Sequence, residues 1–347
     1  MAKRKAKSAI QEFPLIRGLA SRFAHHAPGL VQGIGDDAAV VEATSQTWWH
    51  VTTDLLAEGI HFNFTSAAPE SVGYRAAMAN LSDLAAMGAR PRYLLVSLAI
   101  PKTLTSSDIF KIYSGLMKAC RRDRVALIGG DTSASKTGLF LNITLIGTTP
   151  TQQTLFRHGA QVGDLIYVTG TLGDSLAGLR TLTPLHNTQG TTKRSIALSP
   201  SHQRFLLGRH LHPTARVAEG QWLNQNRLAS AAIDLSDGLS GDLRHLCTAS
   251  GVGAEIELEK LPISAACQAY GQATDSSPVQ LALTGGEDYE LLFTATPDSQ
   301  GKIERQARTR GYRVTCIGTI RPKRFGIQMS SGGRRQPLPV TSYEHFH

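Results

Sequence analysis

The sequence predicts an α/β (α+β) protein built from two domains. Segments with strand-like and helix-like patterns alternate in both halves of the chain, which is typical of mixed sheets that carry helices. The length of 347 residues is also that of two average domains. The polar run Thr148-Thr-Pro-Thr151 separates the two halves. We therefore expect one domain at residues 1–149 and a second at residues 150–347.

In the first half, apolar spacing and turn residues define the elements. Apolar residues recur every three or four positions at 10–23, which predicts a helix. A second helix at 69–87 begins with Pro69, which favours a first turn, and is stopped by Gly88. The aromatic and β-branched residues at 48–53 predict a strand that ends at Asp54. The other expected elements are strands at 93–100, 125–128 and 139–146 and a capped helix at 105–120.

The second half repeats this alternation. Residues 184–200 are polar, rich in Thr and aperiodic, so we expect a surface loop there. Around this loop the same patterns predict strands at 164–169, 254–258, 290–294 and 313–320, and helices at 174–182, 201–211, 213–225 and 239–250.

Composition excludes several classes of protein. With 41% hydrophobic and 18% charged residues, the chain is neither fibrous nor intrinsically disordered. No apolar run is long enough to span a membrane, and no apolar segment follows the basic N-terminus as in a secretory signal. The four cysteines are far apart and predict neither a zinc site nor a disulfide framework. We expect a reducing, cytoplasmic location and no membrane partner.

The net charge of +9 suggests a polyanion partner until the charge is divided by position. The N-terminal tail has four basic residues, Lys3, Arg4, Lys5 and Lys7. A stretch without acids, between Glu304 and Glu344, has nine: Arg305, Arg308, Arg310, Arg313, Arg321, Lys323, Arg324, Arg334 and Arg335. The rest of the chain is therefore net acidic. Nucleic-acid binding is a remote alternative, and we expect no nucleic-acid partner.

Aspartates beside Gly, Ser or Thr stand at the ends of several expected elements, where loops carry functional groups. Each motif alone is ordinary turn or cap chemistry. As a set they need more, because adjacent carboxylates repel and Asp is unfavourable within a helix. Mg²⁺ uses hard oxygen ligands of this kind, together with water and phosphate oxygens. The motifs are Gly33-Ile-Gly-Asp-Asp37, Thr52-Thr-Asp54, Asn80-Leu-Ser-Asp83, Gly129-Gly-Asp-Thr132 and Asp234-Leu-Ser-Asp-Gly238.

Mg²⁺ ligands beside Gly-rich turns indicate phosphoryl chemistry, yet the common phosphate-binding motifs are missing. The sequence contains no P-loop and no protein-kinase signature. Residues 33–38 match the dinucleotide pattern G-x-G-x-x-A, but carboxylates occupy the variable positions where a pyrophosphate would lie. We therefore reject a dinucleotide site.

Seven segments, in order along the chain, resemble the thiamine-monophosphate kinase family of the aminoimidazole-ribonucleotide synthetase-like superfamily. They are Gly33-Ile-Gly-Asp-Asp-Ala-Ala-Val40, Thr53-Asp-Leu-Leu-Ala-Glu-Gly-Ile-His-Phe62, Asn80-Leu-Ser-Asp-Leu-Ala-Ala-Met-Gly-Ala89, Ile128-Gly-Gly-Asp-Thr132, Asp164-Leu-Ile-Tyr-Val-Thr-Gly170, Asp234-Leu-Ser-Asp-Gly238 and Gly285-Gly-Glu-Asp-Tyr-Glu-Leu-Leu-Phe293. The resemblance implies an N-terminal mixed sheet with helices on one face, a C-terminal α/β domain and a homodimer. It also implies ATP-dependent phosphorylation of thiamine monophosphate to thiamine diphosphate with several Mg²⁺ ions, by direct in-line transfer without a covalent enzyme intermediate.

The positions within these motifs imply three groups of site residues. The metal ligands would be Asp37, Thr52, Thr53, Asp54, Asp83, Asp131, Asp234 and Asp237. ATP would contact Tyr113, Gly130, Asp131, Arg157 and Ser236, and Arg157 would stabilise charge on the transferred group. Thiamine monophosphate would contact His61, Glu287 and Tyr343.

The alternative within the superfamily is another ATP-dependent synthetase or dehydratase. Relatives that make selenophosphate use a Cys or selenocysteine near the N-terminus, and the hydrogenase-maturation relatives end in Cys. The first cysteine here is Cys120 and the last residue is His347, which disfavours both.

Overall fold

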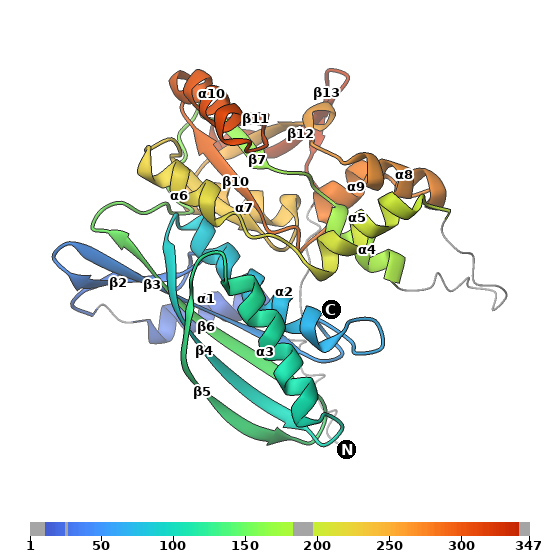
Figure 1. Cartoon of the computed structure of the whole chain (residues 1–347). Coiled ribbons are helices and arrows are strands. Elements are labelled where there is room, and N and C mark those ends of the chain that lie inside the picture. The colour runs from blue at the N-terminus through green and yellow to red at the C-terminus, as the bar shows by residue number, and fades with distance from the viewer. Residues whose placement is uncertain (1–10, 25–26, 183–196, 340–347) are drawn as a thin grey trace, which may run out of the picture.

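The structure, a computed structural model, describes residues 11–24, 27–182 and 197–339. These residues form two sheets with helices packed against each of them (Figure 1). The elements up to residue 150 are α1 (Glu12–Phe23), β1 (Leu30–Gln32), β2 (Ala39–Thr44), β3 (Thr47–Ala57), α2 (Pro69–Ala86), β4 (Arg90–Pro101), α3 (Ser106–Cys120), β5 (Ala126–Ser135) and β6 (Phe140–Pro150). Those that follow are β7 (Leu165–Thr169), α4 (Asp174–Leu182), α5 (Pro200–Leu211), α6 (Val217–Gln225), β8 (Ala231–Leu235), α7 (Leu239–Ser250), β9 (Gly253–Glu257), α8 (Ala265–Thr274), α9 (Pro278–Thr284), β10 (Glu290–Ala295), α10 (Gln300–Arg310), β11 (Val314–Arg321), β12 (Ile327–Ser331) and β13 (Arg334–Pro337).

The first sheet has the strand order β1-β2-β3-β6-β4-β5. It is mixed, as expected, because β4 and β5 are parallel whereas the other neighbours are antiparallel. Alternate residues of its central strands, such as Leu94, Leu141 and Ile143, are fully buried with α2 and α3. The opposite face keeps large apolar side chains exposed, among them Trp49 and Leu55 on β3.

The second sheet has the strand order β13-β12-β9-β11-β7-β10-β8 and is also mixed, because β9 and β12 are parallel. Helices cover both of its faces. Tyr167 and Phe293 stack on the side where α6 and α10 pack, and the adjacent residues Ile166 and Leu292 join the core with α7. This alternation explains why β7 and β10 read as continuous apolar runs.

Helix α2 belongs to both halves of the molecule. It packs on α3 and β6 of the first half and on α6 and β8 of the second. Residues on several faces of the helix are therefore buried, including Arg75, Asn80 and Ser82. The polar positions of α2 consequently face the boundary between the two sheets, where the candidate site lies.

Several expectations about the elements were wrong, and those for β3, β5 and β6 share one origin. β3 does not end at Asp54 but continues to Ala57, because β6 pairs with it along its whole length. The segments 129–132 and 148–150 were expected as a turn and a linker, but they lie within β5 and β6. Pairing with a neighbouring strand thus extends strands through residues that favour turns. The sequence analysis also did not predict β1, β2, α8, α9, α10, β12 and β13, and it began α6 four residues early.

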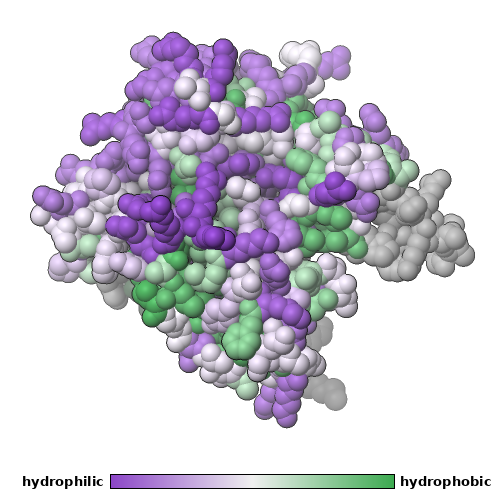
Figure 2. Space-filling view, in the orientation of Figure 1, coloured by the Kyte–Doolittle hydropathy of each residue, from purple (hydrophilic) through white to green (hydrophobic). Residues whose placement is uncertain are grey.

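The surface differs between the two halves. None of the described helices combines the length and apolarity needed to cross a membrane. In Figure 2 the part of the molecule that carries α10 is mostly hydrophilic, whereas apolar side chains come to the surface over the first half. The domain boundary that the sequence predicts between residues 149 and 150 stays a prediction.

Candidate active site

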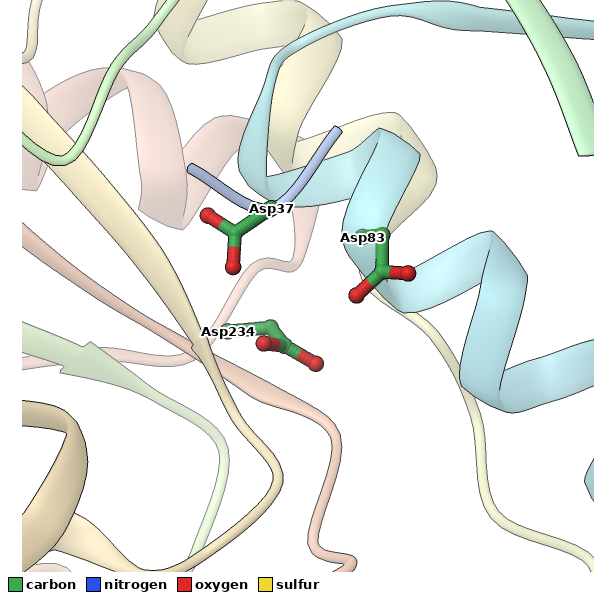
Figure 3. Close-up of side chains that lie close together, drawn as sticks. All are labelled: Asp37, Asp83 and Asp234. Carbon is green, nitrogen blue, oxygen red and sulfur yellow. The ribbon is translucent and has the colours of Figure 1, made fainter. Parts of the chain in front are cut away.

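Three aspartates that are far apart in the sequence converge between the two sheets. Asp37 lies in the turn before β2, Asp83 lies in α2 and Asp234 lies in β8 (Figure 3). One carboxylate oxygen from each lies within 4.8 Å of the others. We call these three residues the carboxylate cluster. Such a group of oxygen ligands suits a hard cation such as Mg²⁺.

Burial makes the negative charge of this cluster costly. It raises the pKa of Asp234 to about 8, with a further contribution from the Asp37 carboxylate. Burial also raises the pKa of Asp83 well above its usual range, and the nearby Asp54 and Asp234 carboxylates add to that effect. Asp54, on the same face of β3 as Thr52, has its pKa raised to about 6 by burial. Four acids thus share a volume that favours either protons or a metal cation.

Two hydroxyl groups orient the cluster. The Ser82 hydroxyl donates to Oδ2 of Asp234 over 2.6 Å and so connects α2 to β8. The Thr52 hydroxyl donates to Oδ2 of Asp83. Each bond engages one carboxylate oxygen of its aspartate. The two donors are neutral, so they fix geometry without compensating the charge.

Arg157 provides a positive charge at the edge of the cluster. Its Nη2 and Nε atoms donate to Oδ1 of Asp37 over 2.5 and 3.2 Å. The Arg157 main chain is held as well, since its N–H donates to the Asp36 carboxylate over 3.2 Å. Burial, with the adjacent Asp37 charge, raises the pKa of Asp36 to about 7. The second oxygen of Asp37, Oδ2, is buried and has no hydrogen-bond partner. This unpaired acceptor is the observation that best fits a bound cation.

The remaining predicted metal ligands are placed differently. The Thr53 side chain is on the opposite face of β3, where its hydroxyl contacts Asn142 and Thr144 on β6. Asp131 is exposed on β5, at the edge of the first sheet, and is not part of the carboxylate cluster. Asp237 follows Asp234 by three residues, and its N–H donates to the buried Asp242. The single chain therefore brings Thr52, Asp54 and Asp237 toward the cluster, but not Asp131 or the Thr53 hydroxyl.

The predicted ATP contacts are similarly divided. Gly130 is exposed on β5, where an added Cβ would lie 1.8 Å from the Val96 carbonyl oxygen, so only glycine fits. Tyr113 is half-buried on α3 against the apolar core. Ser236 lies in the loop after β8, and its carbonyl accepts from the N–H of Glu287 over 2.8 Å. Arg157 and Ser236 are thus beside the cluster, whereas Gly130 is at the far edge of the sheet.

Two of the residues predicted to bind thiamine monophosphate, His61 and Glu287, are joined by a third residue at the boundary between the sheets. His61 follows β3, and Glu287 lies between α9 and β10. The buried guanidinium of Arg75 contacts both, as it donates to the His61 carbonyl over 3.2 Å and to Oε1 of Glu287. Tyr343 lies outside the described residues.

Sequence reasoning missed Arg75, Ser82 and the contact of the Asp36 carboxylate with the Arg157 main chain. A signal existed for Arg75, because a charged residue between Val72 and Ala76 on an apolar helix face needs a buried partner. No such signal marked Ser82. Its role depends on the approach of β8, which the local sequence does not reveal.

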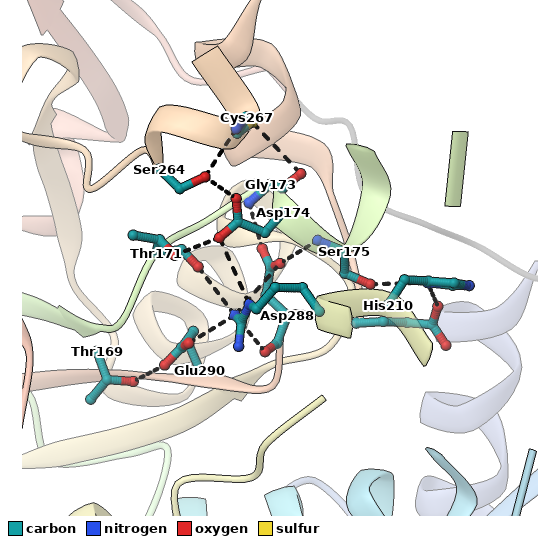
Figure 4. A network of polar contacts seen from close by, with 12 residues as sticks. Thr169, Thr171, Gly173, Asp174, Ser175, His210, Ser264, Cys267, Asp288 and Glu290 are labelled. Atoms are coloured by element: carbon teal, nitrogen blue, oxygen red, sulfur yellow. Dashed lines mark hydrogen bonds and ion pairs between the residues drawn. The ribbon is translucent and has the colours of Figure 1, made fainter. Parts of the chain in front are cut away.

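A second cluster of buried charges lies near α4 and β10 (Figure 4). It contains three acids and two arginines, and we call it the arginine-paired cluster: Asp174, Asp288, Glu290, Arg209 and Arg216. Nη2 of Arg209 donates to Oε1 of Glu290 over 2.8 Å, and Nε of Arg216 donates to Oε2 over 2.5 Å. Burial alone would raise the pKa of Glu290, but Arg216 and Arg209 outweigh it and hold that pKa below its usual range.

The fold and the site are those of a two-domain protein of the AIR synthase related type. The family model described as AIR synthase related protein, N-terminal domain, matches residues 35–149, and the one for the C-terminal domain matches residues 161–329. The thiamine-monophosphate kinase of Haemophilus influenzae is 39% identical over 341 residues, which cover 97% of this chain and 98% of that protein. The enzyme of Escherichia coli K12 is 36% identical and covers 97% of this chain and 99% of its own length. The chain therefore belongs to the thiamine-monophosphate kinase family.

A solved structure supports the same assignment. It is described as AaThiL complexed with AMPPCP and TMP, and it superimposes on this structure with a TM-score of 0.82. Its sequence is 32% identical, and the match covers 99% of this chain and 100% of that one. The fold expected from the sequence is thereby confirmed.

Proposed function

We propose that this chain transfers the γ-phosphoryl group of ATP to thiamine monophosphate and releases ADP and thiamine diphosphate. The observation that carries the proposal is the carboxylate cluster with its unpaired Asp37 oxygen, which lies beside Arg157. The family and the AaThiL complex with an ATP analogue and TMP support the two substrates.

The donor set fits Mg²⁺. Asp37, Asp83 and Asp234 would hold metal directly, and Asp54 and Asp237 are close enough in the fold to bind further ions. Mg²⁺ held by these residues would supply positive charge to neutralise two phosphate chains brought together and to polarise the phosphorus that is attacked. Several ions could be accommodated there, because four acids converge with few compensating cations.

The chain's own residues position the reaction. A phosphate oxygen of the acceptor forms a bond to the γ-phosphorus of ATP, in line with the bridging oxygen, whose bond to that phosphorus breaks as ADP leaves. The acceptor phosphate is already ionised, so no general base and no covalent enzyme intermediate are required. Arg157 stabilises negative charge on the transferred group. His61 and Glu287 hold the acceptor, with Glu287 opposite its cationic ring, and Tyr343 is the proposed aromatic contact.

A homodimer is part of this proposal, because the single chain does not complete its site. Asp131 on β5 is separated from Asp54 on β3 by three strand spacings, or roughly 14 Å. Among the described residues, the face of the first sheet opposite α2 and α3 exposes Trp49 and Leu55 by 45% and 53%. Large apolar side chains on one face favour association. Packing of two such sheets would place β5 of a second copy against β3, the strand that carries Asp54.

Subunit mixing tests this arrangement. Asp83→Asn and Asp131→Asn chains, each inactive alone, are unfolded and refolded together at equal concentration. If the two residues act from different chains, half of the dimers regain one intact site, or about a quarter of wild-type activity. Light scattering measures the oligomeric state. Absence of recovered activity in a confirmed mixed dimer would show that both residues act from one chain.

The function itself is tested with purified protein, Mg-ATP and thiamine monophosphate. Thiamine diphosphate and ADP should form in equal amounts. If ADP is released only when a different acceptor is supplied and no thiamine diphosphate forms, the result would favour the synthetase or dehydratase alternative. The four cysteines are free, as a reducing compartment allows, and we expect the protein in the cytoplasm.

A further inference from the structure

Arg75 is a fully charged residue in a place where apolar residues are the rule. It lies in α2 and is only 2% exposed. Nη1 donates to the carbonyl oxygen of His61 over 3.2 Å, and Nη2 contacts Oε1 of Glu287. A buried guanidinium needs such partners to offset its loss of hydration. One side chain thus connects two residues that come from different halves of the chain.

The segment that carries Glu287 is held in a costly conformation. Glu287 and Tyr289 both have left-handed backbones, with φ of 63° and 51°. The N–H of Glu287 donates to the Ser236 carbonyl, and a Cβ at Gly286 would lie 2.5 Å from that oxygen. Non-glycine residues adopt this conformation only where the surroundings enforce it, most often at functional sites. The backbone therefore aims the Glu287 side chain toward α2.

Glu287 has different neighbours at its two oxygens. Oε1 is held by Arg75, and Oε2 lies 3.6 Å from Nδ1 of His210, which also contacts the Ser175 hydroxyl (Figure 4). Burial, and then the Arg75 charge, lower the pKa of His210 to about 4, so this imidazole is neutral at neutral pH. Arg75 thus supplies the full positive charge in this contact. The Glu287 side chain remains 32% exposed, which leaves it accessible to a ligand.

His61 is fixed at two points. Its Nδ1 accepts the N–H of Ala57 over 3.0 Å, which places the proton of the neutral ring on Nε2. Its carbonyl accepts from Arg75. The Arg75 guanidinium therefore sets the distance between a ring that donates a hydrogen bond and a carboxylate that attracts a cation. Those are the two groups that an acceptor with a phosphate and a cationic ring requires.

We infer that Arg75 is the positioning residue of the acceptor site: it fixes the Glu287 carboxylate to the His61 main chain and so determines how tightly thiamine monophosphate binds. This inference rests on the proposed function. Arg75 contacts no reacting atom, so its effect is on the binding of the acceptor and not on the transfer step.

The test compares Arg75→Met and Arg75→Lys with the wild type in steady-state kinetics. In Arg75→Met the KM for thiamine monophosphate should rise about 10- to 100-fold, with kcat and the KM for ATP nearly unchanged. Arg75→Lys keeps the charge but cannot reach both partners with a planar fork, so a smaller rise is expected. This variant also tests the inference if Arg75→Met folds poorly.

A double-mutant cycle with Glu287→Gln identifies the route of the effect. If Arg75 acts through Glu287, Arg75→Met should raise the KM in the Glu287→Gln background by less than about threefold. A competing acceptor analogue with an uncharged thiophene in place of the thiazolium ring gives a second readout. Arg75→Met should weaken the cationic acceptor more than this neutral analogue.

Arg216→Lys is the matched control, because Arg216 is also a buried arginine paired with a glutamate. It should lower the melting temperature without changing the KM for thiamine monophosphate. An unchanged or lower KM for thiamine monophosphate in Arg75→Met would overturn the inference. A lower KM would show that Arg75 only competes with the cationic ring of the acceptor for the Glu287 carboxylate. Parallel losses for both substrates, as in a general loss of folding, would overturn it too. A wild-type protein that makes no thiamine diphosphate would instead overturn the proposed function, and the inference with it.

Discussion

The carboxylate cluster and the arginine-paired cluster are both buried groups of acids, but the effect of their surroundings on the acids' pKa values is opposite. In the arginine-paired cluster, Arg209 and Arg216 contact Glu290 and hold its pKa below the usual range. In the carboxylate cluster, burial raises the pKa of Asp234 to about 8, and hydroxyl groups rather than cations contact Asp83 and Asp234. Among the described residues, Arg157 is the cation bonded to this second group.

The difference separates a structural role from a binding role. An acid with its cation built in is satisfied by folding alone and has no further use for a metal. Acids that fold together without enough cations are destabilising until a cation arrives. The sequence contains many acids next to glycine and serine, and their motifs alone do not distinguish the two roles. The partners across the fold do.

The largest expected effect comes from Asp83→Asn. Removing one ligand oxygen charge should lower kcat about a thousandfold, because charge on the transferred phosphoryl group loses stabilisation. Without Mg²⁺ the variant should be at least as stable as the wild type, since one repelling buried charge is gone. Steady-state kinetics and denaturant unfolding measure both. Asp275→Asn, at an exposed helix end, is the control and should change neither. A large loss of metal-free stability in Asp83→Asn would contradict a binding role for the cluster.

Glu290→Gln should have the opposite profile. It leaves two buried arginines without their carboxylate and should lower the free energy of unfolding by about 3–5 kcal/mol, with or without Mg²⁺. Denaturant unfolding measures this loss. The partly exposed Glu257, whose side chain is 41% accessible and paired with Lys260, is the matched position, and Glu257→Gln should cost less than about 1 kcal/mol. Similar losses in the two variants would show that the buried arginines are compensated by other groups.

Mg²⁺ should stabilise the protein in a manner that depends on pH. The pKa values of Asp54 and Asp234 are raised to about 6 and about 8, so the folded state retains protons that the unfolded state has lost. The free energy of unfolding of the metal-free protein should therefore fall as pH rises from the usual carboxyl pKa of 3.8 to about 8. A fixed Mg²⁺ concentration, equal to a hundredfold of the Kd at the middle of this range, should restore about 3 kcal/mol there and more at the alkaline end, where fewer protons compete for the carboxylates. Unfolding curves across this range measure this, and a Mg²⁺ effect that decreases with rising pH would contradict it.

Ser82→Ala should have the smallest effect of the four. It removes one neutral hydrogen bond of 2.6 Å to Asp234 and leaves every proposed ligand in place. Loss of an orienting partner of this kind should weaken the apparent Mg²⁺ affinity about tenfold. Activity as a function of Mg²⁺ concentration measures this. Thr181→Ala, which removes a hydroxyl bonded within α4, should leave the Mg²⁺ dependence unchanged. If both variants behave alike, Ser82 has no orienting role.

Part of the fold and of the site could be predicted because its causes are local. The bounds of α2 and α3 follow from Pro69, from apolar periodicity and from the Thr105–Asp108 capping box, all of which act within a few residues. The middle of β5 could not be predicted in this way. Gly129 and Gly130 favour a turn locally, but pairing with β4 keeps them extended. α10 was missed because its strongly polar sequence hides two buried residues, Ile303 and Ala307.

The sequence by itself determined the set of acids, the order of the motifs and the family, because these are properties of residue type and spacing. Only the tertiary structure decided which acids meet. Alternation along β3 sends Thr52 and Asp54 to the cluster and the Thr53 hydroxyl to the other face. The approach of β8 to α2 joins Asp234 to Asp83, and that of the segment before β10 joins Glu287 to Arg75. Such contacts depend on packing between distant segments, which the spacing of residues along the chain does not encode.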